Sequence, residues 1–372
     1  MKISRFLVCV VAAAVASSAM EAYASGERSV PFIYCSDIFH PAMDPDDHFD
    51  LAALFALKEF DVKAVILDGH IDRKGQDQFN GGGRIPLSQM EKIAGYSMPS
   101  AIGFNAKLKK PGDKLLDYEA RYQGGVELMR KVLVESPVPV AVKISTGTDL
   151  AVLFNREPEL CRRKIRAVYM NAGHGAGGAT DEYNVGLDPV AFTRIFETGL
   201  KIYWSPCFGE GRKVGDGHCN FFVVKNQREL LEGASVELSR FFSYALLRPN
   251  ADPLAWLSDG AAAEVPAKSR WMWTPPVLAH AAGRREYCTP DGKYKWLAPS
   301  AAGVAGLSGR EKVVWRFEPA KVTVVEAERE KGVVKVEYGA ADSNVEVFTQ
   351  TSPEYSQVMT SCLSSLYSQL GK

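Results

Sequence analysis

In segment 36–50, four acidic side chains stand between the end of the first β-rich run and the start of the first helical segment: Asp37, Asp44, Asp46 and Asp47. The segment contains no Lys or Arg, so its carboxylates repel one another unless a cation compensates them. Carboxylate oxygens are the hard ligands that calcium and magnesium prefer. The alternative is helix capping by Asp44 or Asp46, with Asp47 complementing the helix dipole. Because capping explains only one or two of the four acids, the pattern favours a metal site.

Other common site signatures are missing from the sequence. There is no D-x-D-x-D-G loop of an EF-hand and no G-x-x-x-x-G-K-S/T phosphate loop. The glycines between residues 209 and 217 follow an apolar run but lack the spacing of a dinucleotide fingerprint. No G-x-S-x-G nucleophile elbow occurs either. The acid segment is therefore the main pointer to chemistry.

The elements that must position these acids alternate along the chain. Short β-rich runs are expected to be strands at residues 30–35, 62–67, 138–144, 165–170 and 200–204. Segments of helical period lie between them at residues 47–60, 87–94, 115–133, 149–154 and 189–197. This alternation predicts an α/β fold with an open, mostly parallel, Rossmann-like sheet and helices on both faces. Ligands of such folds bind at the carboxyl ends of the strands, where the acid segment stands.

The later part of the chain is less regular. Amphipathic helices are expected at 230–247 and 354–370, with a further helix at 277–282 and a strand at 344–349. Alternating residues in 322–326 and 333–338 flank a charged turn and predict a small β-hairpin near the C-terminus. No repeat or linker is visible. One elaborated domain is the simplest interpretation.

The first residues have the pattern of a secretory signal peptide. Basic side chains precede the apolar run 6–15, and an A-x-A site ends at Ala24. An uncleaved anchor is the weaker alternative, because a membrane-spanning helix needs about 20 apolar residues. We therefore expect residues 1–24 to be a signal peptide and residues 25–372 to be the mature domain, secreted or periplasmic.

The charge balance of the chain argues against two classes of partner molecule. The 44 Lys plus Arg residues offset the 44 Asp plus Glu residues, so the formal charge is zero. Nucleic acids and anionic membranes usually require a basic excess, and neither is expected as the main partner.

The cysteine pattern is not that of a zinc site. No C-x-x-C pair occurs, so a zinc ribbon is not indicated. Cys207 and Cys219 could form a disulfide in an oxidising compartment, the alternative being buried free thiols.

The acid segment with its flanks resembles the amino-terminal signature of the inosine-uridine type nucleoside hydrolases. That signature is an apolar strand followed by D-x-D, a short turn, D-D and an apolar helix. Residues 35–37 stand at D-x-D and Asp46-Asp47 at D-D, although Cys35 replaces the first acid and the turn is longer. The resemblance implies that Asp37 is both a calcium ligand and the general base, that Asp47 is a second ligand, and that Asp46 suits sugar hydroxyls.

Further segments resemble the same family in order and spacing. Residues 142–150 look like its strand followed by T-G-P-L-T-N, which implies that the Thr146 backbone carbonyl binds calcium. Residues 181–189 resemble its E-x-N-x-x-x-D-P block, which implies that Glu182 and Asn184 bind the sugar.

Two positions of this pattern are altered. The family's Asn six residues before the Glu is Ala176 here, and Asn171 or His174 could substitute for it. Residues 67–70 resemble a strand ending in G-N, with His70 in place of Asn, so His70 is a further candidate for substrate binding.

The carboxyl-terminal signature of the family is H-D-P-L-A at a helix start. Residues 251–255 fit it with Ala251 in place of His, which implies that Asp252 completes the calcium shell. A competing alignment places Trp273-Thr274-Pro275 there and leaves calcium without that carboxylate; we expect Asp252. Without the family's His, protonation of a departing base could fall to one of four histidines or to none: His70, His174, His218 or His280.

The resemblance predicts calcium-dependent hydrolysis of the N-glycosidic bond of a ribonucleoside, with Asp37 as general base on a metal-bound water. The partner would be a small-molecule nucleoside or a related glycoside. The alternative is a sugar- or nucleoside-binding protein on the same fold, non-catalytic or of different specificity, as the replacements at Cys35, Ala176 and Ala251 suggest. Retention of Asp37 favours catalysis, because a pure binder has little need of a base. The residues leave open the base, the sugar and whether the chain forms a homo-oligomer.

Overall fold

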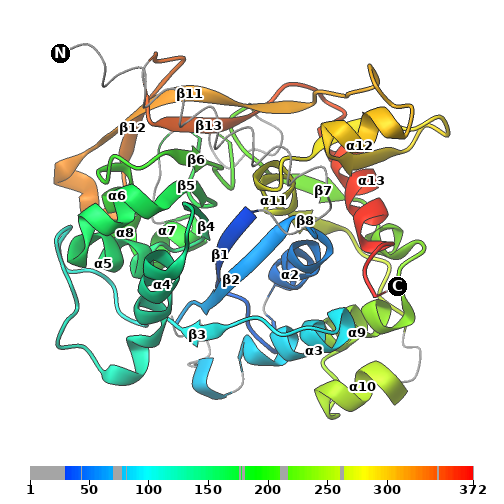
Figure 1. Ribbon diagram of the computed structural model, residues 1–372, viewed down its shortest axis with the longest axis horizontal. Helices are drawn as coiled ribbons and strands as arrows, with labels where there is room; N and C mark the ends of the chain where they lie inside the picture. Colours follow the sequence, from blue (N-terminus) through cyan, green and yellow to red (C-terminus); the bar gives the residue numbers. More distant parts are fainter. Residues whose placement is uncertain are drawn as a thin grey trace.

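The structure, a computed structural model, describes residues 30–42, 44–69, 78–80, 82–175, 177, 181–209, 217–259, 264–341 and 343–371. Nine strands from these ranges form one sheet in the order β12-β11-β13-β6-β5-β4-β1-β2-β3 (Figure 1). Their bounds are β1 Val30–Ser36, β2 Phe60–Leu67, β3 Ser100–Ile102, β4 Val140–Ile144, β5 Ile165–Met170, β6 Ile202–Trp204, β11 Trp315–Val324, β12 Val334–Tyr338 and β13 Val345–Gln350.

The pairing is parallel from β3 through to β13, whereas β11 and β12 run antiparallel at one edge. The predicted open and mostly parallel α/β sheet is therefore confirmed. The predicted hairpin near the C-terminus is confirmed as well, since Val322 of β11 pairs with Val336 of β12.

The central strands are apolar on both sides because both faces of the sheet are covered. In β1, Phe32 and Tyr34 pack into one hydrophobic cluster, and Ile33 and Cys35 pack into another on the opposite face. A parallel strand buried on both faces is expected to be continuously apolar. This packing fixes the direction of β1 and hence the place where the acid segment leaves the sheet.

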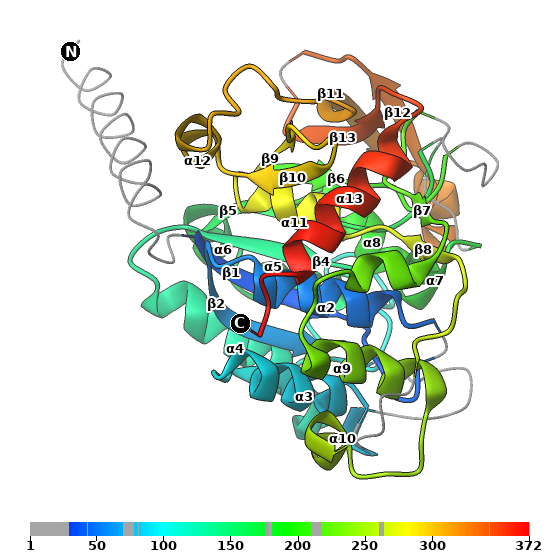
Figure 2. The same cartoon turned by 90° about the vertical axis from the view of Figure 1, so that its right-hand side faces the viewer.

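The helices divide between the two faces, and Figure 1 shows the two groups on opposite sides of the strands. The cluster with Phe32 includes residues of α2 (Asp46–Ala56), α3 (Arg84–Ala94), α9 (Val236–Leu247), α11 (Pro275–Ala281) and α13 (Tyr355–Tyr367). The cluster with Ile33 includes residues of α4 (Gly124–Glu135), α5 (Thr148–Arg156), α6 (Pro158–Lys164) and α8 (Pro189–Phe196). In Figure 2, α13 lies across the same side of the molecule as α2 and α9.

The remaining elements are short. Two antiparallel pairs are formed by β7 (Phe222–Val224) with β8 (Arg270–Met272) and by β9 (Arg285–Cys288) with β10 (Tyr294–Leu297). The other helices are α7 (Tyr183–Leu187), α10 (Pro253–Asp259), α12 (Pro299–Val304), η1 (Gln78–Asn80), η2 (Ala120–Tyr122), η4 (Gln227–Leu231) and η5 (Glu326–Lys331).

The helix expected at 47–60 ends at Ala56, and two other predicted helices begin later than their periodicity indicated. The helix expected at 115–133 begins only at Gly124, because Leu115 has a positive φ of 43° and the following residues form loop and η2. The helix expected at 230–247 begins at Val236, where the Ser235 hydroxyl accepts a hydrogen bond from the Leu238 N–H and caps it. Apolar spacing alone did not reveal either start.

The cysteines from Cys35 onward are free in the part of the chain that the structure describes, so the Cys207–Cys219 disulfide is not formed and the buried-thiol alternative holds. The expected signal peptide and its cleavage site lie outside the described residues. None of the described helices is both long enough and apolar enough to cross a membrane.

Candidate active site

A cavity of about 380 Å³ opens where the central parallel strands end. Its floor is lined by residues that directly follow four strands: Asp37 after β1, Asp68 after β2, Ser145 after β4 and Asn171 after β5. Cys207, in the loop after β6, also lines it. The first turns of α2 and the start of α11 complete the wall. The cavity thus lies at the carboxyl edge of the sheet, as expected for ligand sites of open α/β folds.

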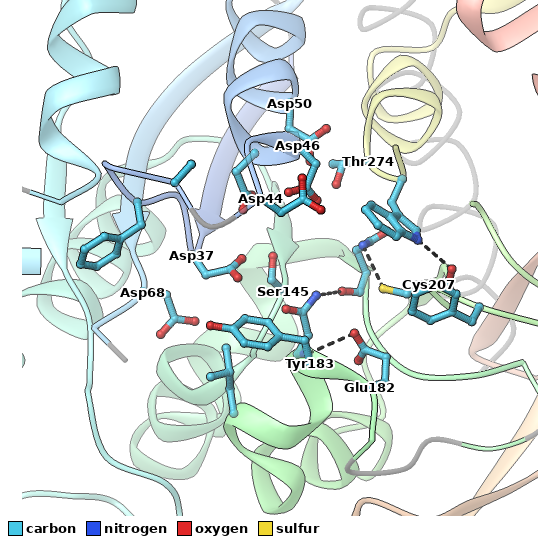
Figure 3. Close-up of a pocket in the computed structure, with 18 of the residues that line it drawn as sticks. Asp37, Asp44, Asp46, Asp50, Asp68, Ser145, Glu182, Tyr183, Cys207 and Thr274 are labelled. Carbon is cyan, nitrogen blue, oxygen red and sulfur yellow. Dashed lines mark hydrogen bonds between the residues drawn. The ribbon is translucent and has the colours of Figure 1, made fainter. Parts of the chain in front are cut away.

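Seven carboxylates line this cavity: Asp37, Asp44, Asp46, Asp47, Asp50, Asp68 and Glu182. In Figure 3, Asp44, Asp46 and Asp50 come from the start of α2 and the turn before it, on the same side as Thr274. Asp37 and Asp68 lie nearer the strand ends. The acids therefore surround the space from several elements and are not confined to the segment 36–50.

Capping does not explain the acids of segment 36–50. The N-cap residue of α2 is Pro45, and no side chain accepts a capping hydrogen bond there. Asp46 and Asp47 stand in the first turn, where they complement the helix dipole. The Ser36 hydroxyl donates to the Asp47 carboxylate over 2.9 Å, which ties the helix start to the end of β1.

The electrostatics indicate that the cluster holds too much negative charge. Burial, followed by repulsion from Asp68, raises the pKa of Asp37 to about 6. Burial and the charge of Asp37 raise the pKa of Asp47 to about 7. Burial and the charge of Asp47 raise the pKa of Asp50 to about 8. Each shift means that the ionised form lacks sufficient compensating positive charge.

The residues fit a hard cation in donor type and in charge. Asp37 and Asp47 offer carboxylate oxygens to one cavity, and Asp50 has a buried carboxylate oxygen without a hydrogen-bond partner. Across the described residues, no three His, Cys, Asp or Glu side chains are close enough to form a preassembled metal centre. The donors are thus present at the cavity but do not converge into a preformed shell.

The side of the cavity formed by β5 and α7 is a hydrogen-bonded network. The Glu182 carboxylate accepts from the backbone N–H groups of Gly173, Asn184 and Val185, over 2.8 to 3.1 Å, and caps α7. The Asn184 side-chain amide donates to the Asn171 carbonyl over 2.9 Å. Polar groups that are held by the backbone in this way are preorganised, because their rotamers are fixed before a ligand arrives.

Aromatic side chains form another part of the wall. The Trp273 indole donates to the Cys207 carbonyl over 2.7 Å, and its ring lies edge-on to Phe208 with 5.8 Å between centroids. Phe39, Tyr183 and other apolar side chains also line the cavity. The cavity therefore combines acidic and amide side chains with aromatic rings, as a ligand with a sugar and a flat ring would require.

Comparison with known proteins shows what the chain is similar to. Over 194 residues, the chain is 43% identical to the pyrimidine-specific ribonucleoside hydrolase RihA of Salmonella newport, a match covering 47% of this chain and 59% of that protein. Over these residues the chain is similar to a ribonucleoside hydrolase. A shorter match, 42% identical over 81 residues, links it to the RihA protein of Citrobacter koseri and covers 21% of this chain and 26% of that one. No family model matches the chain.

A solved structure shows the shared fold. The purine-preferring ribonucleoside hydrolase from Gardnerella vaginalis superposes with a TM-score of 0.50 at 11% identity, covering 91% of this chain and 99% of that one. The chain spans less than two thirds of the length of the curated relatives it matches. These comparisons therefore show a partial sequence similarity and a shared fold.

The structure brings most residues of the nucleoside hydrolase pattern together. Six predicted residues line the same cavity: Asp37, Asp46, Asp47, Asn171, Glu182 and Asn184. Thr146 is buried beside the cavity-lining Ser145, and its hydroxyl has no hydrogen-bond partner. His70 lies outside the described residues.

Asp252 is placed away from the cavity. Its side chain is exposed, and its carboxylate accepts from the N–H groups of Leu254 and Ala255 at the start of α10. Thr274, at the start of α11, lines the cavity instead. The geometry therefore follows the competing alignment, and the preference for Asp252 rested on an Asp-Pro pair that begins a surface helix.

The remaining candidate histidines do not line the cavity within the described ranges. His174 contacts Asp181, and His218 stacks on Tyr338 with 3.6 Å between centroids. His280 is partly buried and packs among aromatic rings, and desolvation lowers its pKa to about 4.

Sequence reasoning gave no role to three polar lining residues: Asp50, Asp68 and Ser145. Helical spacing could have found Asp50, because it stands one turn after Asp46 and Asp47 on the same helix. Asp68 follows the strand whose end was already suspected of ligand binding. Trp273 belongs to the competing alignment, and it lines the cavity together with Thr274.

Proposed function

We propose that this chain hydrolyses the N-glycosidic bond of a ribonucleoside, with Asp37 as general base and Ca2+ as cofactor. One observation carries the proposal. Asp37 and Asp47 of the acid segment and Glu182, from a distant part of the sequence, line one cavity at the carboxyl edge of the sheet. The relatives named as ribonucleoside hydrolases support the same activity.

The calcium would be held by the Asp37 and Asp47 carboxylates with the Thr146 backbone carbonyl. When bound, it supplies Lewis acidity that lowers the pKa of water in the site. The burial-raised pKa values of Asp37 and Asp47 support a cation there, because a nearby positive charge favours both ionised carboxylates. Asp252 is not part of this ligand set, since it is exposed at α10.

The reaction follows from the carboxylates around the sugar half of the cavity. Asp37 accepts a proton from a water as that water attacks the anomeric carbon, and the bond to the base nitrogen breaks. Attack opposite to the leaving base gives inversion through an oxocarbenium-like transition state. The negative charge of Asp46 and Glu182 favours the cationic sugar of that state.

The polar side chains of the cavity and its aromatic wall would bind different parts of the substrate. Asp46, Asn171 and Asn184 suit the sugar hydroxyls, and the network that fixes Asn184 preorganises this half. The aromatic wall with Trp273 and Phe208 suits the flat base by stacking. This division predicts a small uncharged nucleoside or related glycoside as ligand.

We further propose that residues 1–24 direct export and that the mature chain acts outside the cytoplasm. The support is the amino-terminal pattern alone. Amino-terminal sequencing of the protein recovered from a secreting host tests it. A first residue of Ser25 is expected, and an intact Met1 contradicts it.

The activity itself is tested by a calcium titration with a panel of nucleosides and other glycosides, measuring release of reducing sugar. Release that requires calcium is the expected result. Binding of a nucleoside without any release contradicts the enzyme and favours the binding protein. Release of sugar after complete removal of divalent ions contradicts the role of calcium as cofactor but not the hydrolase activity.

A further inference from the structure

A buried lysine lies directly beneath the cavity and takes no part in the proposed reaction. Lys143 is on β4, paired in register with Tyr34 of β1, and its side chain is 1% exposed. Its ammonium donates to the Ser145 hydroxyl over 2.7 Å and to the Cys35 carbonyl over 3.2 Å. Both acceptors stand at the carboxyl ends of their strands, and Ser145 lines the cavity. The positive charge is therefore fixed at the floor of the site.

The partners of this ammonium are neutral. Fully buried lysines are rare unless a carboxylate pairs with them. Within the described ranges no carboxylate oxygen lies within 4.0 Å of the Lys143 ammonium, which instead lies 4.8 Å from the centre of the Tyr34 ring. A buried cation held by a carbonyl, a hydroxyl and an aromatic face is oriented but not neutralised.

The charge that compensates Lys143 is the acidic cluster as a whole. Ser145, which accepts a hydrogen bond from this ammonium, lines the same cavity as three of the acids: Asp37, Asp47 and Asp50. One ammonium thus acts on several acids through space, as expected in a poorly solvated site where charges are weakly screened.

The residue type near the end of β1 also makes the cavity less negative. Cys35, whose carbonyl accepts from Lys143, stands where the related D-x-D signature has its first acid. The floor of this cavity therefore has no carboxylate at residue 35 to oppose the Lys143 ammonium. A bound divalent cation would meet a site that already contains positive charge.

We propose that Lys143 is a built-in cation of the acidic cavity, a positioning residue that shares the neutralisation of the carboxylates and thereby weakens the binding of divalent cations. This inference rests on the proposed calcium site in the same cavity. In this role Lys143 sets the affinity of the site for a divalent metal, although it is not a metal ligand.

The test is calorimetric titration of the purified chain with Ca2+ alone, without substrate. At about pH 8 the carboxylates bind calcium with little competition from protons. The Lys143→Met variant should bind calcium at least about five-fold more tightly, since removal of one nearby like charge is worth roughly this much at high effective dielectric. A merely structural lysine would leave the dissociation constant unchanged or raise it.

Lys164 provides a matched control. Its ammonium also donates to a backbone carbonyl, that of Ser136, but it lies at the end of α6 next to the amino end of β5, on the edge opposite the cavity. Lys164→Met changes the net charge equally and should keep the wild-type affinity for calcium. If Lys143→Met does not give a cooperative thermal transition, Lys143→Gln, which is neutral and retains a donor, takes its place.

The outcomes separate this inference from the proposed cofactor. Equal calcium affinity of the wild type and Lys143→Met overturns the role of Lys143 and leaves the calcium site standing. Binding by Lys143→Met but not by the wild type supports the role of Lys143 and contradicts calcium as the native cofactor. Absence of binding in both overturns both. Equal tightening in Lys164→Met overturns the role of Lys143, because net charge then explains the effect.

Discussion

The hydroxyl of Ser36, the last residue of β1, donates a hydrogen bond to the carboxylate of Asp47 in the first turn of α2. The same hydroxyl accepts from the Ile38 N–H over 3.2 Å, so its orientation is fixed. This contact joins the two halves of the acid segment across a turn. It also lowers the pKa of Asp47 against the larger effects of burial and of the Asp37 charge.

Replacing Ser36 by Ala should therefore weaken metal binding. Loss of a hydrogen bond to a charged acceptor costs about 1.5–3 kcal/mol, and part of that cost should appear as a higher calcium dissociation constant. Calorimetric titration of Ser36→Ala measures it. Ser343→Ala is the control, because its hydroxyl donates to the Ala320 carbonyl away from the cavity. Equal calcium affinity in wild type and Ser36→Ala would show that the contact does not position Asp47.

The pH dependence should report the raised pKa of Asp37. A general base acts in its ionised form, so activity should fall as pH drops through about 6. An unperturbed Asp would lose activity only near about 3.9. Calcium favours the ionised carboxylate, so saturating calcium should move this acid limb to lower pH. Initial rates against pH at low and saturating calcium measure the shift, and an acid limb that calcium leaves unmoved counts against a shared site.

The two alignments of the carboxyl-terminal signature predict different mutants. Asp252→Ala should destabilise the chain by about 1 kcal/mol through loss of a helix cap and leave calcium affinity unchanged. Thr274→Val should alter substrate or calcium binding, because Thr274 lines the cavity and bonds to Asp50. Thermal melts and titrations of both variants decide between them. A specific loss of calcium affinity in Asp252→Ala would restore the first alignment.

The edge hairpin is predicted to support the sugar side of the cavity. Gly332 has a φ of +69°, and an added Cβ would lie 2.3 Å from the Val185 side chain on α7. Gly339 has a similar φ of +74° but open space around it. Gly332→Ala should therefore cost more than Gly339→Ala, whose backbone penalty is about 1–2 kcal/mol.

Chemical denaturation of the two glycine variants measures this difference. Because Val185 follows Asn184 on α7, Gly332→Ala should also raise the KM for a nucleoside, while Gly339→Ala should not. Equal stabilities of the two variants would show that α7 gives way to the added methyl group.

Much of the fold was predictable because its signals are local. Val30–Ser36 and Ile165–Met170 are apolar runs of strand length, and they form the central strands as predicted. The short strands Phe222–Val224 and Arg270–Met272 were not predicted, because they are stable only through pairing between residues far apart in the chain. Leu115 illustrates the same limit, since its positive φ interrupts a segment with good helical spacing.

The site was predictable where a chemical pattern coincided with a strand end or a helix start. Asp37 and Asp47 satisfied that condition, and both line the cavity. Asp252 had a suitable sequence neighbourhood but is exposed, because the path of the chain after α9 takes it to the surface. Lys143 had no recognisable pattern, and its significance appears only from its burial beneath the acids.

The most direct measurement is the release of ribose by Asp37→Asn, compared with wild type, at saturating calcium. Removal of the general base should reduce kcat by about 10²–10⁴-fold without loss of the folded state. Asp61→Asn is the control, because Asp61 pairs with Lys63 on β2 outside the cavity lining. A wild type that releases ribose and an Asp37→Asn variant that does not are the predicted result. Full activity in Asp37→Asn would contradict the assignment.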